Sequence, residues 1–91
     1  MENILIPPEL AILWRLAGRT APGEYAGWLE SKFQIDRPRA HILMIRGALM
    51  DLEQDPPGGP IAQEDLAVLL RSADEHVRLF AAGLSGRPGL G

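Results

Sequence analysis

The sequence predicts an all-α fold: a small four-helix domain with two short N-terminal helices packed on an antiparallel hairpin of two longer helices. Two observations predict it. Proline and glycine divide the chain into four segments, and each segment repeats its apolar residues with a helical period. Strand signals are weak, because no stretch sustains an apolar–polar alternation and no Asn-Gly or Asp-Gly turn occurs.

The first two segments predict the short helices. The first runs from Pro8 to Gly18, and proline suits its opening turn. The second runs from about Ala21 to Phe33, with Thr20 expected as its N-cap. The apolar residues of each segment share one face: Leu10, Leu13, Trp14 and Ala17 in the first, and Tyr25, Trp28, Leu29 and Phe33 in the second.

The third segment predicts a central helix from the N-cap Asp36 to about Gln54. It is apolar on most of its circumference, as buried helices usually are. Gly47 weakens the helix by about 1 kcal/mol relative to alanine but leaves room for a neighbouring helix to approach closely. One apolar stripe is expected to face the fourth segment: Ile42, Ile45, Leu49 and Leu52.

The fourth segment, Ile61 to Leu84, predicts the other long helix. Its seam is spaced like a heptad repeat and consists of Leu66, Leu70, Ala73, Val77, Phe80 and Leu84. We expect a continuous helix. The alternative is a break near Ser72, where the stretch to Glu75 matches a capping box. The short Pro/Gly-rich connection at 55–60 favours an antiparallel hairpin with the third segment.

Length and composition favour one domain over residues 1–85, followed by a flexible C-terminal tail at 86–91. The chain has 91 residues, no cysteine and a net charge of −3. The charge gives no overall basic footprint for nucleic acid or an anionic membrane. Without cysteine there are no disulfides, which favours a cytoplasmic location. No apolar stretch approaches the length of a membrane span.

Motifs for catalysis are weak, and we predict neither an enzyme nor a cofactor. The predicted hairpin would bring His41 near Asp74, Glu75 and His76, a set that could hold a divalent metal. Histidines at the edge of an apolar stripe are more often solvated or hydrogen-bonded, so we predict no metal. No nucleophile motif, phosphate loop or small-molecule substrate site is evident.

The start of the third segment is similar to the second half of a helix-turn-helix, over about residues 20–50. In that motif the N-terminal residues of the second helix reach the bases. The residues that would contact nucleic acid are Arg37, Arg39, His41 and Arg46. Two features oppose this interpretation. The connection from Leu29 to Ile35 is long for the motif, and the same helix face continues into apolar residues.

The interpretation that we favour is a small intracellular protein–protein interaction module that associates with itself or with another protein. The third segment has more apolar surface than one neighbour can cover. The residues expected to bind the partner are Leu43, Met44, Gly47 and Met50. Methionine suits adaptable surfaces but also fills ordinary cores. An internal position, covered by the first two helices, therefore stays open as the alternative for this patch.

Overall fold

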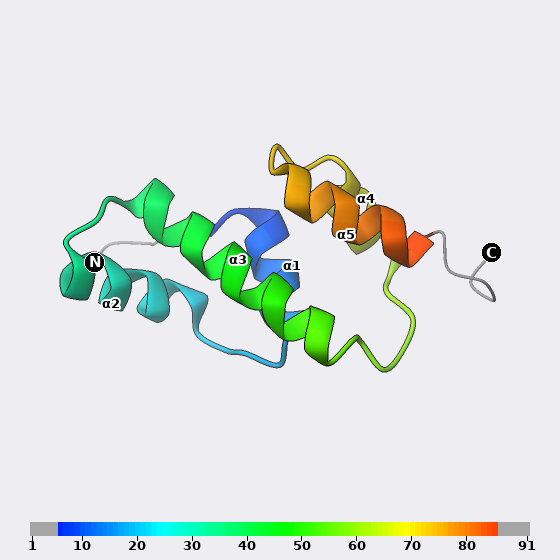
Figure 1. Cartoon of the computed structure of the whole chain (residues 1–91), viewed down its shortest axis with the longest axis horizontal. Helices are drawn as coiled ribbons and strands as arrows, with labels where there is room; N and C mark the ends of the chain where they lie inside the picture. Colours follow the sequence, from blue (N-terminus) through cyan, green and yellow to red (C-terminus); the bar gives the residue numbers. More distant parts are fainter. Residues whose placement is uncertain (1–5, 86–91) are drawn as a thin grey trace. The chain divides into compact units, whose positions relative to one another are not determined.

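The computed structural model describes residues 6–85, and within that range it contains helices and no strand. The all-α class is therefore confirmed. The helices are α1 (Pro8–Leu16), α2 (Pro22–Phe33), α3 (Arg37–Gln54), α4 (Gln63–Leu70) and α5 (Glu75–Ser85) (Figure 1). The chain divides into two compact units, residues 1–57 and 58–91, and each is described by itself.

The prediction of a single domain over residues 1–85 stays a prediction, and the predicted tail at 86–91 lies outside the described residues. None of the helices in residues 6–85 combines the length and the apolar character that a membrane span requires.

Unit 1, residues 1–57, is built on α3, which packs against both α1 and α2 (Figure 1). The predicted apolar face of α1 is confirmed for Leu10, Leu13 and Trp14, which are buried, whereas Ala17 is half-buried and follows the last residue of α1. From α2, the buried residues are Ala26 and Leu29. The buried residues of α3 are Ala40, Met44, Ile45, Ala48, Leu49 and Leu52.

The ends of the unit 1 helices follow their local sequence. Asp36 is the N-cap of α3, as predicted, and its Oδ1 accepts a hydrogen bond of 3.1 Å from the Arg39 N–H. Thr20 does not cap α2. The N-cap is Ala21, whose backbone is left-handed with φ 49°, and Pro22 follows at the first helical position. The ring of Pro22 fixes its φ at a value that suits the first turn of a helix, so Pro22 marks the start of α2.

The loop between α1 and α2 is tied to both α1 and α3. The Trp14 Nε1–H donates a hydrogen bond of 2.9 Å to the Thr20 carbonyl, which gives that buried indole its polar partner. The Arg19 guanidinium lies 4.8 Å from the centre of the Trp14 ring. Its Nε donates to Asp51 Oδ2 on α3 at 2.7 Å, and this bond raises the pKa of Arg19.

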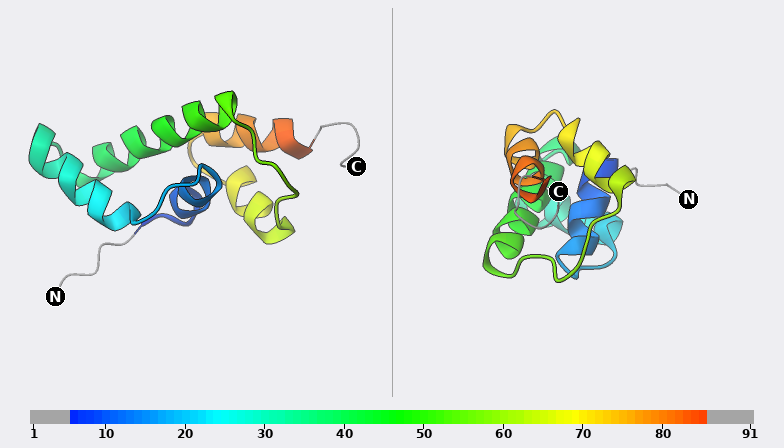
Figure 2. Two further views of the ribbon diagram at one scale, coloured as in Figure 1. Left: turned by 90° about the horizontal axis from the view of Figure 1, so that it is seen from below. Right: turned by 90° about the vertical axis from the view of Figure 1, so that its right-hand side faces the viewer.

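Unit 2, residues 58–91, is a hairpin of α4 and α5, and Figure 2 shows its two helices from two further directions. The continuous helix predicted from Ile61 to Leu84 is wrong, because residues 71–74 form a turn between two helices. The predicted seam fails with it. Leu70 and Ala73 are exposed, and the apolar residues buried in this unit are Leu69, Val77 and Ala81.

Short polar side chains explain the break in the fourth segment. Ser72 Oγ accepts a hydrogen bond of 3.1 Å from the Asp74 N–H, and Asp74 Oδ1 accepts one of 2.8 Å from the His76 N–H. Arg78 also donates to the Ser72 carbonyl at 2.7 Å. Side chains of this type compete with the helical ladder for backbone groups and favour helix starts. The predicted alternative, a break near Ser72, is therefore what the structure contains, but Asp74 caps α5 and not Ser72, which the capping box would have used.

The predicted hairpin of two long helices is not confirmed, because the fourth segment forms two helices of 8 and 11 residues instead of one. The predicted pairing of α3 with residues 61–84 would lie between the two units, and it stays a prediction.

We predict that Leu13→Ala destabilises unit 1 by about 2–5 kcal/mol, because Leu13 is fully buried and its truncation leaves a cavity. Both tryptophans of the chain, Trp14 and Trp28, lie in unit 1, so their fluorescence during urea unfolding reports on this unit. Met50→Ala is the matched control and should cost less than about 1 kcal/mol, because Met50 is exposed. Equal losses for the two variants would contradict the described core.

Candidate interaction surface

The four residues predicted to bind a partner do not all reach the surface. Leu43 and Met50 are exposed, with 50% and 62% of their surface accessible. Met44 is 1% exposed and belongs to the core of unit 1, so its assignment to a partner surface is corrected. Gly47 is half-buried, and an added Cβ there would meet no described atom within 4 Å. The close approach expected at Gly47 is therefore not made by the described residues.

The exposed side of α3 is a single stripe along the helix. At 100° per residue, the members of this stripe lie within about 60° of Arg46 on either side. All of them are exposed: Arg39, Ile42, Leu43, Arg46, Met50 and Glu53. We call this set the outer stripe. It carries an apolar middle section with a positive charge at one end, another at its centre and a negative charge at the other end.

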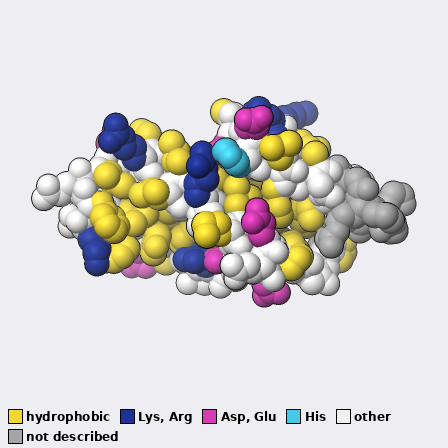
Figure 3. Space-filling view, viewed as in Figure 1, with side chains coloured by type: hydrophobic (Ala, Val, Ile, Leu, Met, Phe, Trp, Pro, Cys, Tyr) yellow, Lys and Arg dark blue, Asp and Glu magenta, His cyan; other side chains and the backbone are white. Residues whose placement is uncertain are grey.

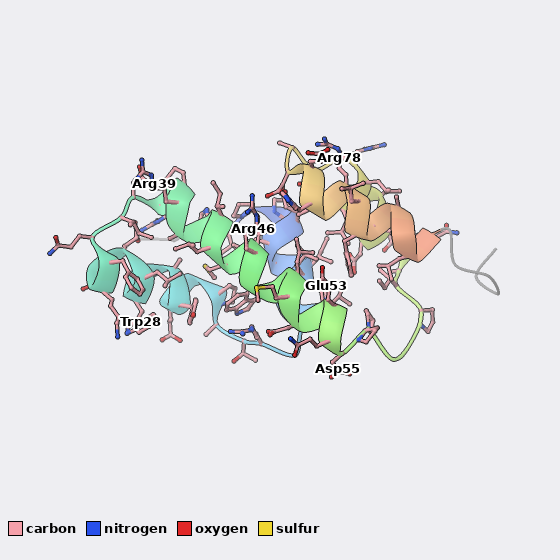
Figure 4. The ribbon with its side chains drawn as sticks, viewed as in Figure 1. Trp28, Arg39, Arg46, Glu53, Asp55 and Arg78 are labelled. Carbon is pink, nitrogen blue, oxygen red and sulfur yellow. The ribbon has the colours of Figure 1, made fainter. Side chains whose placement is uncertain are left out.

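Figure 4 shows the charged members of the outer stripe in order along α3. Arg39, Arg46 and Glu53 project from the same side of the helix. They are seven residues apart, close to two helical turns. Within the described part of the chain, none of the three forms an ion pair. Figure 3 shows hydrophobic side chains gathered on the face over α2 and α3, with basic side chains among them.

Sequence reasoning missed Ile42, which was assigned to a seam with the fourth segment. The structure leaves it 46% exposed, while Ile45, Leu49 and Leu52 of the same predicted stripe are buried. One signal could have found it. Ile42 lies about 40° from Arg46 on the helical wheel, on the side that the heptad-spaced charges mark as outward.

The four residues of the helix-turn-helix alternative fall into two groups. Arg39 and Arg46 are exposed on the outer stripe. Arg37 is held by Glu30 of α2 through two hydrogen bonds, of 2.9 Å from Nη2 and 3.3 Å from Nε. His41 is partly buried. Two of the four side chains are therefore at the surface, while Arg37 links α3 to α2.

The turn between α2 and α3 is shorter than the stretch from Leu29 to Ile35 that was counted against a helix-turn-helix. Because α2 continues to Phe33, only residues 34–36 connect the two helices, with Gln34 left-handed at φ 54°. A turn of this length is usual in helix-turn-helix units. The objection that the connection is too long is therefore wrong. The second objection gains weight, because exposed Ile42 and Leu43 lie between the two free arginines.

His41 lies at the corner where α2 and α3 meet. Its Nε2 is buried and has no hydrogen-bond partner among the described residues. Burial lowers the pKa of His41, and the charge of Arg37 lowers it further, while Glu30 acts in the opposite direction. A neutral imidazole is the form that this corner accommodates, because charging a desolvated ring beside a guanidinium is unfavourable.

A second exposed apolar feature lies on α2 and was not expected. Trp28 and Phe33, predicted to lie on the apolar face of the second segment, are 48% and 54% exposed. The centroids of the Trp28 and Phe33 rings are 6.3 Å apart, and those of the Trp28 and Tyr25 rings are 5.5 Å apart. Lys32 Nζ lies 5.0 Å from the centre of the Trp28 ring. These contacts run along one helix and give the aromatic rings neighbours without burying them.

The predicted hairpin would bring His41 near Asp74, Glu75 and His76, a set that could hold a divalent metal ion. Across residues 6–85, no group of three His, Cys, Asp or Glu side chains is placed to hold a metal ion. His41 belongs to unit 1 and the other three residues to unit 2. Asp74 and His76 act locally at the start of α5, with His76 Nδ1 3.4 Å from Asp74 Oδ1.

Comparison with protein families, curated proteins and solved structures finds no match.

We predict that unit 1 loses stability as the pH falls below about 6.5. The pKa of His41 is lower in the folded state than in the unfolded chain, so the unfolded chain takes up the proton first. The stability that neutral His41 contributes is complete above the ordinary value of about 6.5. It is lost as the pH falls from there through the lowered value.

The test is urea unfolding followed by tryptophan fluorescence between pH 8 and pH 5. In His41→Gln, the urea concentration at the unfolding midpoint should fall less steeply as the pH is lowered. His76→Gln is the control, because His76 lies in unit 2 and is exposed. If the midpoint of His41→Gln depends on pH as steeply as that of the wild type, His41 is not the cause of the loss of stability.

Proposed function

We propose that the protein is a small non-enzymatic interaction module that binds a protein partner, another protein or a second copy of itself, through the outer stripe of α3. One observation carries the proposal: Ile42, Leu43 and Met50 are each about half exposed or more on the same face of one helix. Gly47 flanks this face with open space beside it. Met44 is not part of the surface.

The arrangement favours a protein partner because it repeats the spacing of helix-in-groove recognition. In that mode the apolar anchors of a helix recur every three or four residues along one face. Ile42, Arg46 and Met50 are four residues apart, with Leu43 beside them. Methionine adapts to varied partners, and arginine is enriched in protein interfaces.

The energetics predict a modest affinity for the outer stripe alone. Complete burial of an isoleucine, leucine or methionine side chain contributes about 1.5–3 kcal/mol. Half of that for three side chains is about 2–5 kcal/mol, whereas association costs about 4–15 kcal/mol of translational and rotational freedom. The partner must therefore add contacts beyond these three residues, or bury matching apolar residues of its own. A cysteine-free chain of this size fits a role inside the cell, and we propose a cytoplasmic location.

A nucleic-acid-binding regulator is the second candidate, and two observations favour it. The turn between α2 and α3 has only three residues, and Arg39 and Arg46 are exposed on the same side of α3. Ile42 and Leu43 lie between these arginines, where a groove-reading helix needs polar side chains. Arg37 is already paired with Glu30. The protein-partner proposal accounts for the apolar residues, and the nucleic-acid candidate does not.

We predict that a photo-crosslinking residue at position 43 forms covalent adducts with protein chains in the cell, because position 43 lies within the proposed contact. Met50→Glu should reduce the yield of these adducts at least about fivefold, since a carboxylate loses hydration when an apolar contact closes over it. Circular dichroism should show an unchanged fold, because Met50 is exposed.

The matched control is the same residue at position 79. Leu79 is 63% exposed and lies in unit 2, outside the outer stripe. Adducts at 79 should not respond to Met50→Glu. The absence of adducts at 43, or adducts that Met50→Glu leaves unchanged, would overturn the proposal.

The nucleic-acid candidate predicts a different result in a titration with duplex DNA. Its binding would weaken steeply between about 50 and 200 mM salt, because each phosphate contact releases counterions. Arg39→Ala and Arg46→Ala would each reduce both the affinity and the salt dependence. Under the protein-partner proposal, we expect no binding at the lower salt concentration. Arg71→Ala, an exposed arginine of unit 2, is the matched control.

A further inference from the structure

We propose that the occupant of the outer stripe is a second copy of the same chain, with the two α3 helices antiparallel and crossing at Arg46. This inference rests on the proposed function and names its partner. It follows from the order of residues along the stripe, which is nearly symmetric about Arg46.

The symmetry is visible in the spacing. Ile42 lies four residues before Arg46, and Met50 lies four residues after it. Arg39 lies seven residues before Arg46, and Glu53 lies seven residues after it. In an antiparallel pair related by a two-fold axis at Arg46, a residue before Arg46 faces the residue equally far after it on the partner. Ile42 then faces the partner's Met50, and Arg39 faces the partner's Glu53.

Charge complementarity favours this orientation. Arg39 and Glu53 are exposed, and neither forms an ion pair within the described residues. The antiparallel arrangement forms the Arg39–Glu53 contact twice, once on each side of the axis. A parallel arrangement would instead place Arg39 beside the partner's Arg39 and Glu53 beside the partner's Glu53, which is repulsive.

Arg46 stands on the axis and faces the partner's Arg46. Two guanidinium groups at the centre weaken the pair. A charged or polar residue at one seam position is also a known means of fixing register at a cost in stability. Gly47, with open space where a Cβ would stand, is next to the axis and leaves room for the partner's Arg46 to turn aside. The dimer is therefore expected to be weak and limited to one register.

Sedimentation equilibrium of the full chain tests the proposal. We expect a reversible dimer whose dissociation constant falls about tenfold or more in Arg46→Met, because the like charges leave the axis. Arg71→Met, an exposed arginine of unit 2, should leave the dissociation constant unchanged. A weaker dimer in Arg46→Met would place the axis elsewhere and overturn this register.

The charge pair is tested by reversal. Glu53→Arg should weaken the dimer about tenfold, and Arg39→Glu combined with Glu53→Arg should restore it to within about threefold. Gln54→Arg, which adds a positive charge on the same helix outside the outer stripe, is the matched control. Failure of the double variant to restore association would overturn the Arg39–Glu53 contact.

The failure of this inference differs from the failure of the proposed function. If the wild type and Arg46→Met both stay monomeric at the highest attainable concentration, the second copy is excluded as the partner. Position 43 would then still crosslink to a different protein if the proposed function holds. If position 43 forms no adducts either, both are overturned.

Discussion

The burial of one side of α3 under α1 and α2 is the constraint on which unit 1 depends. The third helix is apolar on most of its circumference, and the two short helices that pack on it cover only one side. The covered side includes Ala40, Met44 and Ala48, each fully buried or nearly so. Their spacing of four residues puts a small, a large and a small side chain on one line. Helical geometry then places the outer stripe on the opposite side.

The first three helices could be predicted because their signals are local. Proline marks the start of α1, Asp36 caps α3, and the apolar period of α1 has one consistent reading. The fourth segment could not be predicted as two helices from its period, since the spacing runs through residues 71–74 without interruption. The break depends on hydrogen bonds that the Ser72 and Asp74 side chains accept from backbone N–H groups, which give the backbone an alternative to the helical pattern.

The candidate surface could be predicted only in part, because a helical wheel does not show which side the neighbours take. Leu43 and Met44 are adjacent in the sequence and similarly apolar, yet one is exposed and the other is buried. The difference arises because α1 and α2 pack on the side of α3 that carries Met44. The sequence marks that side only through the small residues Ala40 and Ala48, which lie on the same line of the helix. The charged residues of α3 indicate its exposed side better than the apolar residues do. Arg39, Arg46 and Glu53 share an angular position, and that position marks the outward side.

Those same charges limit what can bind the outer stripe. An apolar stripe without them would associate in either direction and at any register, which favours aggregation. Arg39 and Glu53 at opposite ends give the stripe a polarity, so that reversing a bound helix changes attraction into repulsion. Arg46 in the centre makes the apolar area discontinuous and penalises partners that cannot accommodate a guanidinium group. The affinity that Arg46 removes is the cost of a defined orientation, and the proposed second copy of the stripe would satisfy that orientation without any further sequence requirement.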